Sequence, residues 1–235
     1  MADLSFMVDD STVGYVDEYV AVEAAKKPPR RYLGMSEIGG ECTRALWLKC
    51  HTDFKETFSG SQYRLFDTGH LIERRVVRNL RAAGLEVTQR QKSFSVFRGR
   101  LRGHWDGLIT GLRESTRPHV LEIKSASEKN FKILKDAGIE SSPRYLAQVQ
   151  MYMGCSGLDR ALFIVENKNT SERIQERIRF DRDRFDMLRE KARLIIEAQT
   201  PPSGINDNPA WWQCKICPLN NEQWCRKEWK SKDTW

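Results

Sequence analysis

The sequence has no apolar run that approaches the roughly 18 residues a helix needs to span a bilayer. Its first ten residues contain three acidic residues and no basic one, so they lack the positively charged start of a secretory signal peptide. These two absences argue against membrane-spanning and secreted classes of protein. We therefore expect a cytoplasmic protein.

The sequence also lacks the Gly-x-x-x-x-Gly-Lys-Ser/Thr loop that binds nucleotide phosphates, so any motor working with this chain would be a separate chain. It has no internal repeat and no low-complexity tract. Its 235 residues are 40% hydrophobic and 30% charged, which is ordinary for a soluble globular protein. One domain of moderate size is expected.

Charge is unevenly distributed along the chain. Residues 1–25 contain six acidic residues and no Lys or Arg, while the whole chain has a formal net charge of +7. Residues 26–235 therefore have a net charge of +13. This imbalance favours a polyanionic partner such as nucleic acid, although a basic surface that only keeps the protein soluble would give the same count.

The order of expected elements is helix, strands, helices, strands, helix, which fits an α/β fold with a mixed sheet flanked by helices. Helical spacing of apolar residues predicts helices over 62–83, 127–137, 143–154 and 181–197. Strand patterns cover 85–89, 92–97, 101–109, 120–125, 161–165 and 173–180. We expect an acidic appendage with a basic hinge over 1–31, the core over 32–200, and a Cys/Trp-rich segment over 201–235.

Two carboxylates and a lysine lie on neighbouring predicted strands. Asp106 is in the first strand, and Glu122 and Lys124 are two residues apart in the second, so their side chains emerge on one face. Such a cluster can bind a divalent cation and activate water for phosphodiester cleavage. A solvent-facing Glu–Lys pair is the alternative, but it leaves Gln148 and Tyr152, on one face of the next predicted helix, unexplained.

Six cysteines in a reducing compartment argue for metal binding or chemistry rather than for disulfides. Cys214, Cys217 and Cys225 lie within twelve residues, so a fourth ligand must come from elsewhere. Cys42 and Cys50 compete for that place; they are eight residues apart, about 12 Å along a helix, so both are not expected to bind one group. Thiolates suit an iron–sulfur cluster and zinc equally well.

Taken together, these motifs resemble the PD-(D/E)XK nuclease superfamily, specifically its RecB-like branch. That branch has Gly-x-x-x-His/Glu on a first helix, Gly-x-x-Asp and Glu-x-Lys on successive strands, and Gln-x-x-x-Tyr on a helix. The matching elements are Gly69-His-Leu-Ile-Glu73, Gly103-His-Trp-Asp106, Glu122-Ile-Lys124 and Gln148-Val-Gln-Met-Tyr152. The resemblance spans residues 35–228 and implies a three-layer α/β/α core, like that of restriction endonucleases, with a mixed central sheet.

The resemblance implies a Mg²⁺- or Mn²⁺-dependent DNA exonuclease that acts in recombination, repair or end processing. Metal would be held by Glu73, Asp106, Glu122 and the backbone carbonyl of Ile123, with His70 as a less favoured ligand. Lys124 would act on the attacking water, and Gln148 and Tyr152 would position the substrate or the lysine. The alternative is a non-catalytic DNA-binding or assembly module that retains the nuclease fold.

In the same branch, AddB-type subunits and CRISPR-adaptation nucleases bind a 4Fe–4S cluster through one N-terminal and three C-terminal cysteines. Cys42-Thr-Arg44 and Cys217-Pro218 resemble the two elements concerned. The resemblance therefore implies a cluster, with Zn²⁺ as the alternative, that joins the two ends of the chain through Cys42, Cys214, Cys217 and Cys225. Unrelated reduced cysteines are the remaining explanation.

Single-stranded DNA and duplex ends both remain open as substrates. Arg44, Arg74, Arg144 and Trp229 are candidate DNA contacts, although solvated or packed side chains explain them as well. Stand-alone chains of this size in the branch are often phage recombination nucleases or CRISPR-adaptation nucleases. The resemblance thus implies a recombination or helicase partner chain, and the cytoplasm of a bacterium or a phage-infected host.

Overall fold

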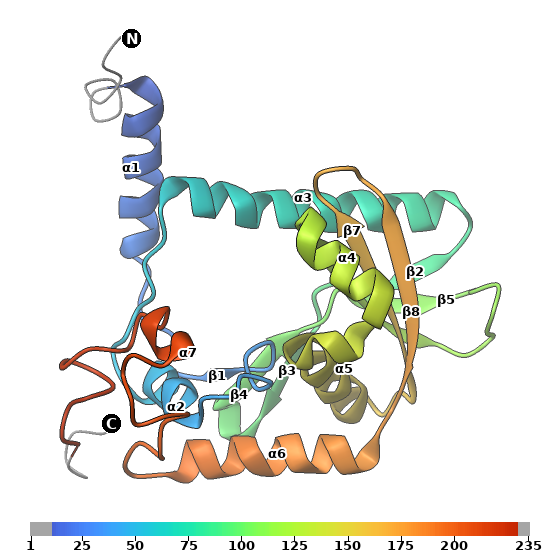
Figure 1. Cartoon of the computed structure of the whole chain (residues 1–235). Coiled ribbons are helices and arrows are strands. Elements are labelled where there is room, and N and C mark those ends of the chain that lie inside the picture. The colour runs from blue at the N-terminus through green and yellow to red at the C-terminus, as the bar shows by residue number, and fades with distance from the viewer. Residues whose placement is uncertain (1–10, 230–235) are drawn as a thin grey trace.

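A five-stranded mixed sheet lies at the centre of the computed structural model, which describes residues 11–229 (Figure 1). The strand order is β2-β5-β6-β7-β8, in which β6 and β7 are parallel and the other neighbours are antiparallel. The strands are β2 (Glu86–Thr88), β5 (Gly107–Thr110), β6 (His119–Ala126), β7 (Arg160–Asn167) and β8 (Arg173–Arg179). A second sheet, with the order β1-β4-β3, is formed by β1 (Leu33–Gly34), β3 (Ser93–Val96) and β4 (Leu101–His104).

One face of the central sheet is covered by α3 (Gly60–Ala82), which spans the top of the molecule in Figure 1. Its buried Ile72 and Val76 pack with Leu121 and Ile123 of β6, because alternate residues of a strand face the same side. The helix begins with a capping box between Ser59 and Gln62 and matches the helix expected over 62–83.

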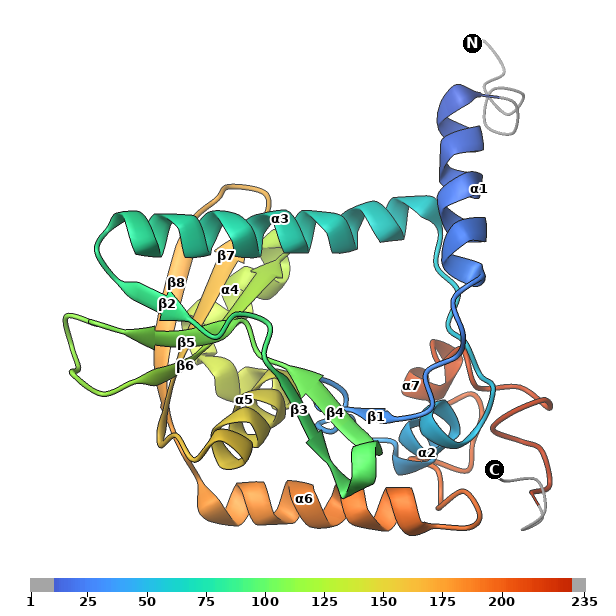
Figure 2. The ribbon, with the colours of Figure 1, turned by 180° about the vertical axis from the view of Figure 1, so that it is seen from behind.

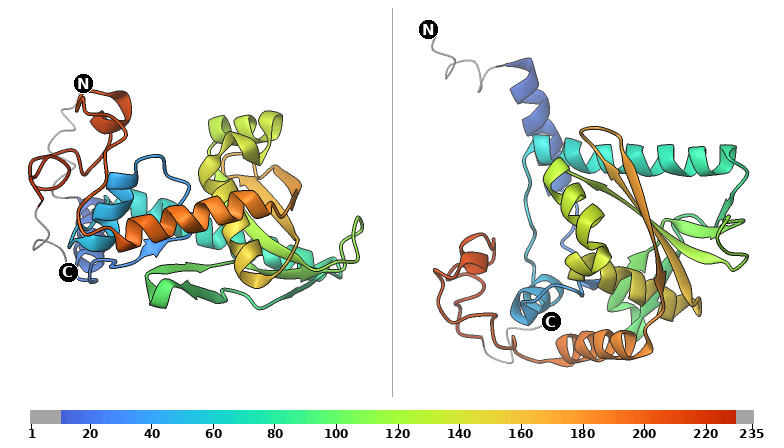
Figure 3. Two further views of the ribbon diagram at one scale, coloured as in Figure 1. Left: turned by 90° about the horizontal axis from the view of Figure 1, so that it is seen from below. Right: turned by 45° about the vertical axis from the view of Figure 1, so that its right-hand side comes forward.

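The other face is covered by α4 (Glu128–Ala137) and α5 (Pro143–Ser156), and α6 (Arg182–Glu197) packs against α5. Figure 3 shows α6 along the lower side of the molecule, next to α5. Gly154 allows this contact, because a Cβ there would lie 2.2 Å from the ring of Phe185 on α6. Helices on both faces of a mixed sheet confirm the predicted three-layer α/β/α fold.

The strand pattern expected over 101–109 is in fact two strands in different sheets. β4 ends at His104 and pairs with β3, while β5 begins at Gly107 and pairs with β6. Figure 2 shows the β3–β4 hairpin leaving the central sheet at this point. Short 3₁₀ turns lie at Phe97–Gly99 and Ile139–Ser141, and the second buries Ile139. Asp106 lies where the two sheets separate.

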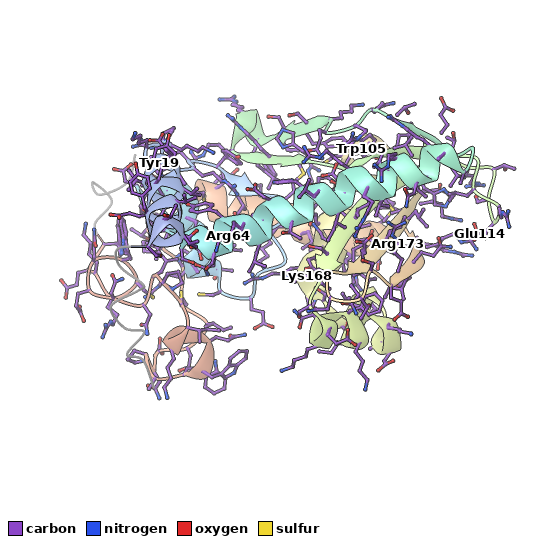
Figure 4. All side chains as sticks on the ribbon, turned by 90° about the horizontal axis from the view of Figure 1, so that it is seen from above. Tyr19, Arg64, Trp105, Glu114, Lys168 and Arg173 are labelled. Carbon is purple, nitrogen blue, oxygen red and sulfur yellow. The ribbon has the colours of Figure 1, made fainter. Side chains whose placement is uncertain are left out.

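Outside the core, α1 (Thr12–Ala25) stands at the beginning of α3 (Figure 1). There Asp17 pairs with Arg64, which is labelled in Figure 4. The sequence indicated an appendage over 1–31 but no helix there, and residues 1–10 lie outside the described part. The expected C-terminal segment, 201–235, is described to residue 229 and contains α7 (Trp212–Lys215).

The C-terminal segment returns to α2 (Thr43–His51), near the beginning of the chain. The Arg44 guanidinium donates to the carbonyl of Pro202 at 2.8 Å and to that of Cys225 at 3.0 Å. The Trp47 indole donates to the carbonyl of Ala198 at 2.9 Å. Among residues 11–229, no helix has the length and apolar character to cross a membrane.

Candidate active site

The candidate site is at the opening between β5 and β6. The ladder between these strands ends at the pair Gly107 and Leu121, so the next residue of β6 with an N–H directed toward β5, Ile123, has no strand partner on that side. The Asp106 carboxylate takes that place and accepts the Ile123 N–H at 2.7 Å. This hydrogen bond fixes Asp106 against β6, directly beside Glu122.

Glu122 and Lys124 emerge together from β6, as their spacing predicts. The Lys124 Nζ lies 2.7 Å from Glu122 Oε1 and 5.3 Å from the centre of the Tyr145 ring on α5. The Glu122 side chain is 2% exposed, and its Oε2 is buried without a hydrogen-bond partner among the described atoms. A buried carboxylate oxygen without a partner is unfavourable unless a cation or water binds it.

Glu73 of α3 reaches the same cluster through the turn between β2 and β3. The Gln91 amide donates to Glu73 Oε1 at 2.9 Å and to Asp106 Oδ1 at 3.4 Å. Arg90 in the same turn donates to Glu73 Oε1 at 3.0 Å. The sequence motifs identified Glu73 and Asp106, but they contain no signal for Arg90, Gln91 or Tyr145.

Burial and the charges within the acidic cluster shift the pKa values of Asp106, Glu122 and Lys124. Burial, and then the charge of Glu122, raises the pKa of Asp106 well above its usual range. Burial also raises the pKa of Glu122, although Lys124 opposes the effect. For Lys124, burial alone would lower the pKa, but Glu122 and Asp106 outweigh it and raise the pKa above its ordinary value. A site of this kind favours the binding of positive charge.

Gln148 and Tyr152 share one face of α5, as expected, and both are buried. The Gln148 amide donates to the Tyr152 hydroxyl at 3.1 Å, and this hydroxyl donates to the carbonyl of His104 at 2.6 Å. Gly103 makes the approach possible, because a Cβ there would lie 2.9 Å from the Tyr152 ring. The two α5 side chains thus hold the end of β4, two residues before Asp106.

The predicted metal ligands are only partly assembled. His70 is exposed on α3, and no hydrogen bond or ion pair between described residues links it to the carboxylates. At Ile123 the contact to the cluster comes from the N–H rather than from the predicted carbonyl ligand. Within residues 11–229, no three His, Cys, Asp or Glu side chains form a group that could hold a metal ion. The ligand set remains a prediction.

A second candidate region lies between α2, the beginning of α5 and the C-terminal segment. A cavity of about 560 Å³ is lined by the four predicted ligands Cys42, Cys214, Cys217 and Cys225. Burial raises the pKa of Cys217, and the three other thiols raise it further. Cys50 does not line the cavity; it is buried in the core, and its thiol donates to the carbonyl of Trp47.

The four candidate DNA contacts have different surroundings. Arg74 is exposed on α3, and Arg144 is exposed at the start of α5 beside the cysteine cavity. Arg44 donates hydrogen bonds to backbone carbonyls of the C-terminal segment. Trp229 packs edge-on against Trp47, with ring centres 5.5 Å apart. These contacts give Arg44 and Trp229 a structural role, while a DNA-binding role for any of the four stays a prediction.

No protein-family model matches the chain, and no curated protein matches its sequence. Among solved structures, it is similar to the alkaline exonuclease LHK-Exo from Laribacter hongkongensis, with a TM-score of 0.50 and 15% identity over 72% of this chain and 87% of that one. The same exonuclease in complex with dAMP gives a TM-score of 0.50 and 16% identity over 70% and 86%. At these identities the likeness shows the fold alone.

Proposed function

We propose that this chain is a Mg²⁺- or Mn²⁺-dependent deoxyribonuclease that removes nucleotides from DNA ends. The observation that carries the proposal is the cluster of the buried Glu122 with the half-buried Asp106 and Lys124, where β5 and β6 separate. The fold likeness to LHK-Exo supports exonucleolytic action, because that protein is described as an alkaline exonuclease. DNA recombination, repair or end processing would be its setting, in the cytoplasm.

The residues present fit a divalent cation. Asp106 and Glu122 offer carboxylate oxygens, one of which is buried without a partner, and Mg²⁺ commonly binds through only one or two protein carboxylates. Glu73 would add a third carboxylate. When bound, the metal ion would lower the pKa of the attacking water and offset negative charge on the scissile phosphate.

The protein's own side chains would stabilise charge at the phosphate and hold the carboxylates in position. Lys124, held by Glu122 at 2.7 Å, would place its ammonium beside the reacting phosphate and stabilise the charge that develops there. Tyr152 would keep the end of β4, and hence Asp106, in position through its 2.6 Å hydrogen bond to the carbonyl of His104. Gln148 would orient the Tyr152 hydroxyl.

Digestion of end-labelled DNA with Mn²⁺ tests the assignment. The wild-type protein should degrade linear DNA and leave a closed circle intact, and Lys124→Ala should abolish cleavage while the fold is retained. Lys135→Ala is the matched control, because Lys135 also lies 2.7 Å from a glutamate but is exposed on α4. Equal activity of wild type and Lys124→Ala would refute the proposal, and metal binding without cleavage would favour a non-catalytic DNA-binding module.

We further propose that Cys42, Cys214, Cys217 and Cys225 bind a 4Fe–4S cluster, with Zn²⁺ as the alternative, and that residues 201–235 complete this site over a nuclease core of residues 32–200. The cavity that all four cysteines line supports this assignment. Anaerobically purified protein should absorb near 400 nm, and Cys214→Ala should lose the absorbance. Stoichiometric zinc without iron would replace the cluster by a zinc site.

A further inference from the structure

The turn that joins β2 to β3 has an unusual backbone. Gln89 and Gln91 have positive φ angles of 46° and 54°, although neither is Gly. Residues with side chains rarely adopt this left-handed conformation, and where they do it is frequently at a functional site. The turn, residues 89–92, brings Arg90 and Gln91 to the carboxylates of the candidate site.

The turn is anchored to the residue that precedes Asp106. The indole of the buried Trp105 donates to the Gln89 carbonyl at 2.7 Å, and the Lys92 ammonium lies 5.6 Å from the centre of the Trp105 ring. The Lys92 N–H closes the turn on the Gln89 carbonyl at 3.3 Å. Because Trp105 is adjacent to Asp106 in the chain, the turn and the carboxylate share one rigid support.

The two side chains of the turn contact the carboxylates differently. Arg90 brings a full positive charge to Glu73 Oε1 at 3.0 Å, and no hydrogen bond or ion pair among residues 11–229 joins it to Asp106. Gln91 is neutral and bridges Glu73 and Asp106, at 2.9 and 3.4 Å. The described side chains therefore give Glu73 one cationic partner and one neutral partner that also links it to Asp106.

We propose that this turn is a latch that sets the divalent-cation concentration at which the site is loaded: Arg90 competes with the cation for Glu73, and Gln91 keeps Glu73 and Asp106 paired. The inference rests on the proposed function. An incoming divalent cation is repelled by the guanidinium, whose charge already pairs with Glu73 at Oε1. The neutral amide can remain on one oxygen of each carboxylate while their other oxygens bind the cation.

The two residues thus act with opposite sign on metal affinity. Removal of a unit charge about 5 Å from a divalent cation in a water-like dielectric strengthens binding about tenfold. Arg90→Ala should therefore bind Mn²⁺ about tenfold more tightly than wild type. Arg90→Lys retains the charge and should stay within about threefold of wild type. Gln91→Ala should bind Mn²⁺ several-fold more weakly, because Glu73 and Asp106 lose the donor that holds them together.

Calorimetric titration of the full chain with Mn²⁺, without DNA, tests the latch. The heat of Mn²⁺ binding that is lost in Asp106→Asn belongs to this site. The matched control is Arg113→Ala, which removes an exposed arginine of the loop between β5 and β6 and should bind Mn²⁺ as tightly as wild type. Thermal unfolding in EDTA verifies that each variant is folded. Arg90→Gln serves as a second neutral variant in case Arg90→Ala does not fold.

The outcomes separate the latch from the proposed function. Tighter binding by Arg90→Ala together with weaker binding by Gln91→Ala supports the latch, because a merely structural turn would weaken binding in both variants. Unchanged or weaker binding by both neutral Arg90 variants overturns the latch and leaves the nuclease assignment standing. A wild-type protein with no Mn²⁺ binding that depends on Asp106 would refute the metal site itself, and the latch with it.

Discussion

Replacement of Glu166 by Ala should destabilise the protein, because Glu166 anchors α3, the helix that carries Glu73. Glu166 lies on β7, its side chain is 0% exposed, and it pairs with Arg75 of α3 and with Arg173 of β8, the latter at 2.7 Å. Arg75 is two residues after Glu73 on the same helix. The buried carboxylate therefore joins α3 to two strands of the central sheet, at the level of the candidate site.

The expected size of the effect follows from the exposure of the three side chains. Loss of one partner of a buried ion pair usually destabilises a protein by about 3–5 kcal/mol, because it leaves an unpaired buried charge. Here the two arginine side chains are 42% and 33% exposed, so water can solvate them after the change. We expect the lower end, about 3 kcal/mol, which lowers the melting temperature of a chain of this length by about 6–12 °C.

Thermal unfolding followed by circular dichroism measures this change. The control is Glu172→Ala, which removes an ion pair of 2.7 Å with Lys135 whose side chains are 50% and 51% exposed. Surface pairs of this kind contribute little to stability, so the control should melt close to wild type. A Glu166→Ala melting temperature equal to that of the control would refute the argument that this network anchors α3.

Three other perturbations should give distinct results. Burial, and then the Arg100 guanidinium, lowers the pKa of His51 from 6.5 to about 4. The contribution of neutral His51 to stability is therefore present above pH 6.5 and is lost as the pH falls toward 4. Urea unfolding across this range should show the loss of stability, and His51→Phe should reduce this dependence on pH. Gly103→Ala places a Cβ 2.8 Å from that of Met35 and 2.9 Å from the Tyr152 ring, and should lower stability by about 1–3 kcal/mol in the same assay. Metal analysis should show loss of iron or zinc in Cys42→Ala and retention in Cys50→Ala, because Cys50 lies in the core outside the cysteine cavity.

Local sequence patterns predicted the sheet flanked by helices and the common face of Glu122 and Lys124. The spacing of apolar residues predicted a helix over 62–83, and the structure has this helix at Gly60–Ala82. The two-residue spacing of Glu122 and Lys124 placed them on one face of β6, where they form an ion pair. Such predictions succeed because helix and strand geometry acts over a few residues, and the motif residues lie within single elements.

Other features depend on contacts between distant residues and left no local signal. The run 101–109 alternates like one strand, but the hydrogen bond from Ile123 to Asp106 replaces a ladder bond, and the strand divides there. The sequence did not predict the left-handed backbone of Gln91, because this conformation is usually indicated by Gly and that position has none. Its contact with Glu73 joins residues 18 positions apart, across a turn whose shape depends on Trp105.

One helix, α5, contributes residues both to the cysteine cavity and to the surroundings of the carboxylates. Pro143, at the start of α5, lines the cavity with Gly39 and Cys42, and the approach is close: a Cβ on Gly39 would lie 2.6 Å from the Pro143 carbonyl oxygen. Further along the same helix, Tyr152 holds the His104 carbonyl beside the candidate site at 2.6 Å. An α-helix transmits a displacement at its first turn along its axis, because its backbone hydrogen bonds fix each turn to the next. The wall of the cysteine cavity and the end of β4 beside Asp106 are therefore held by one continuous helix.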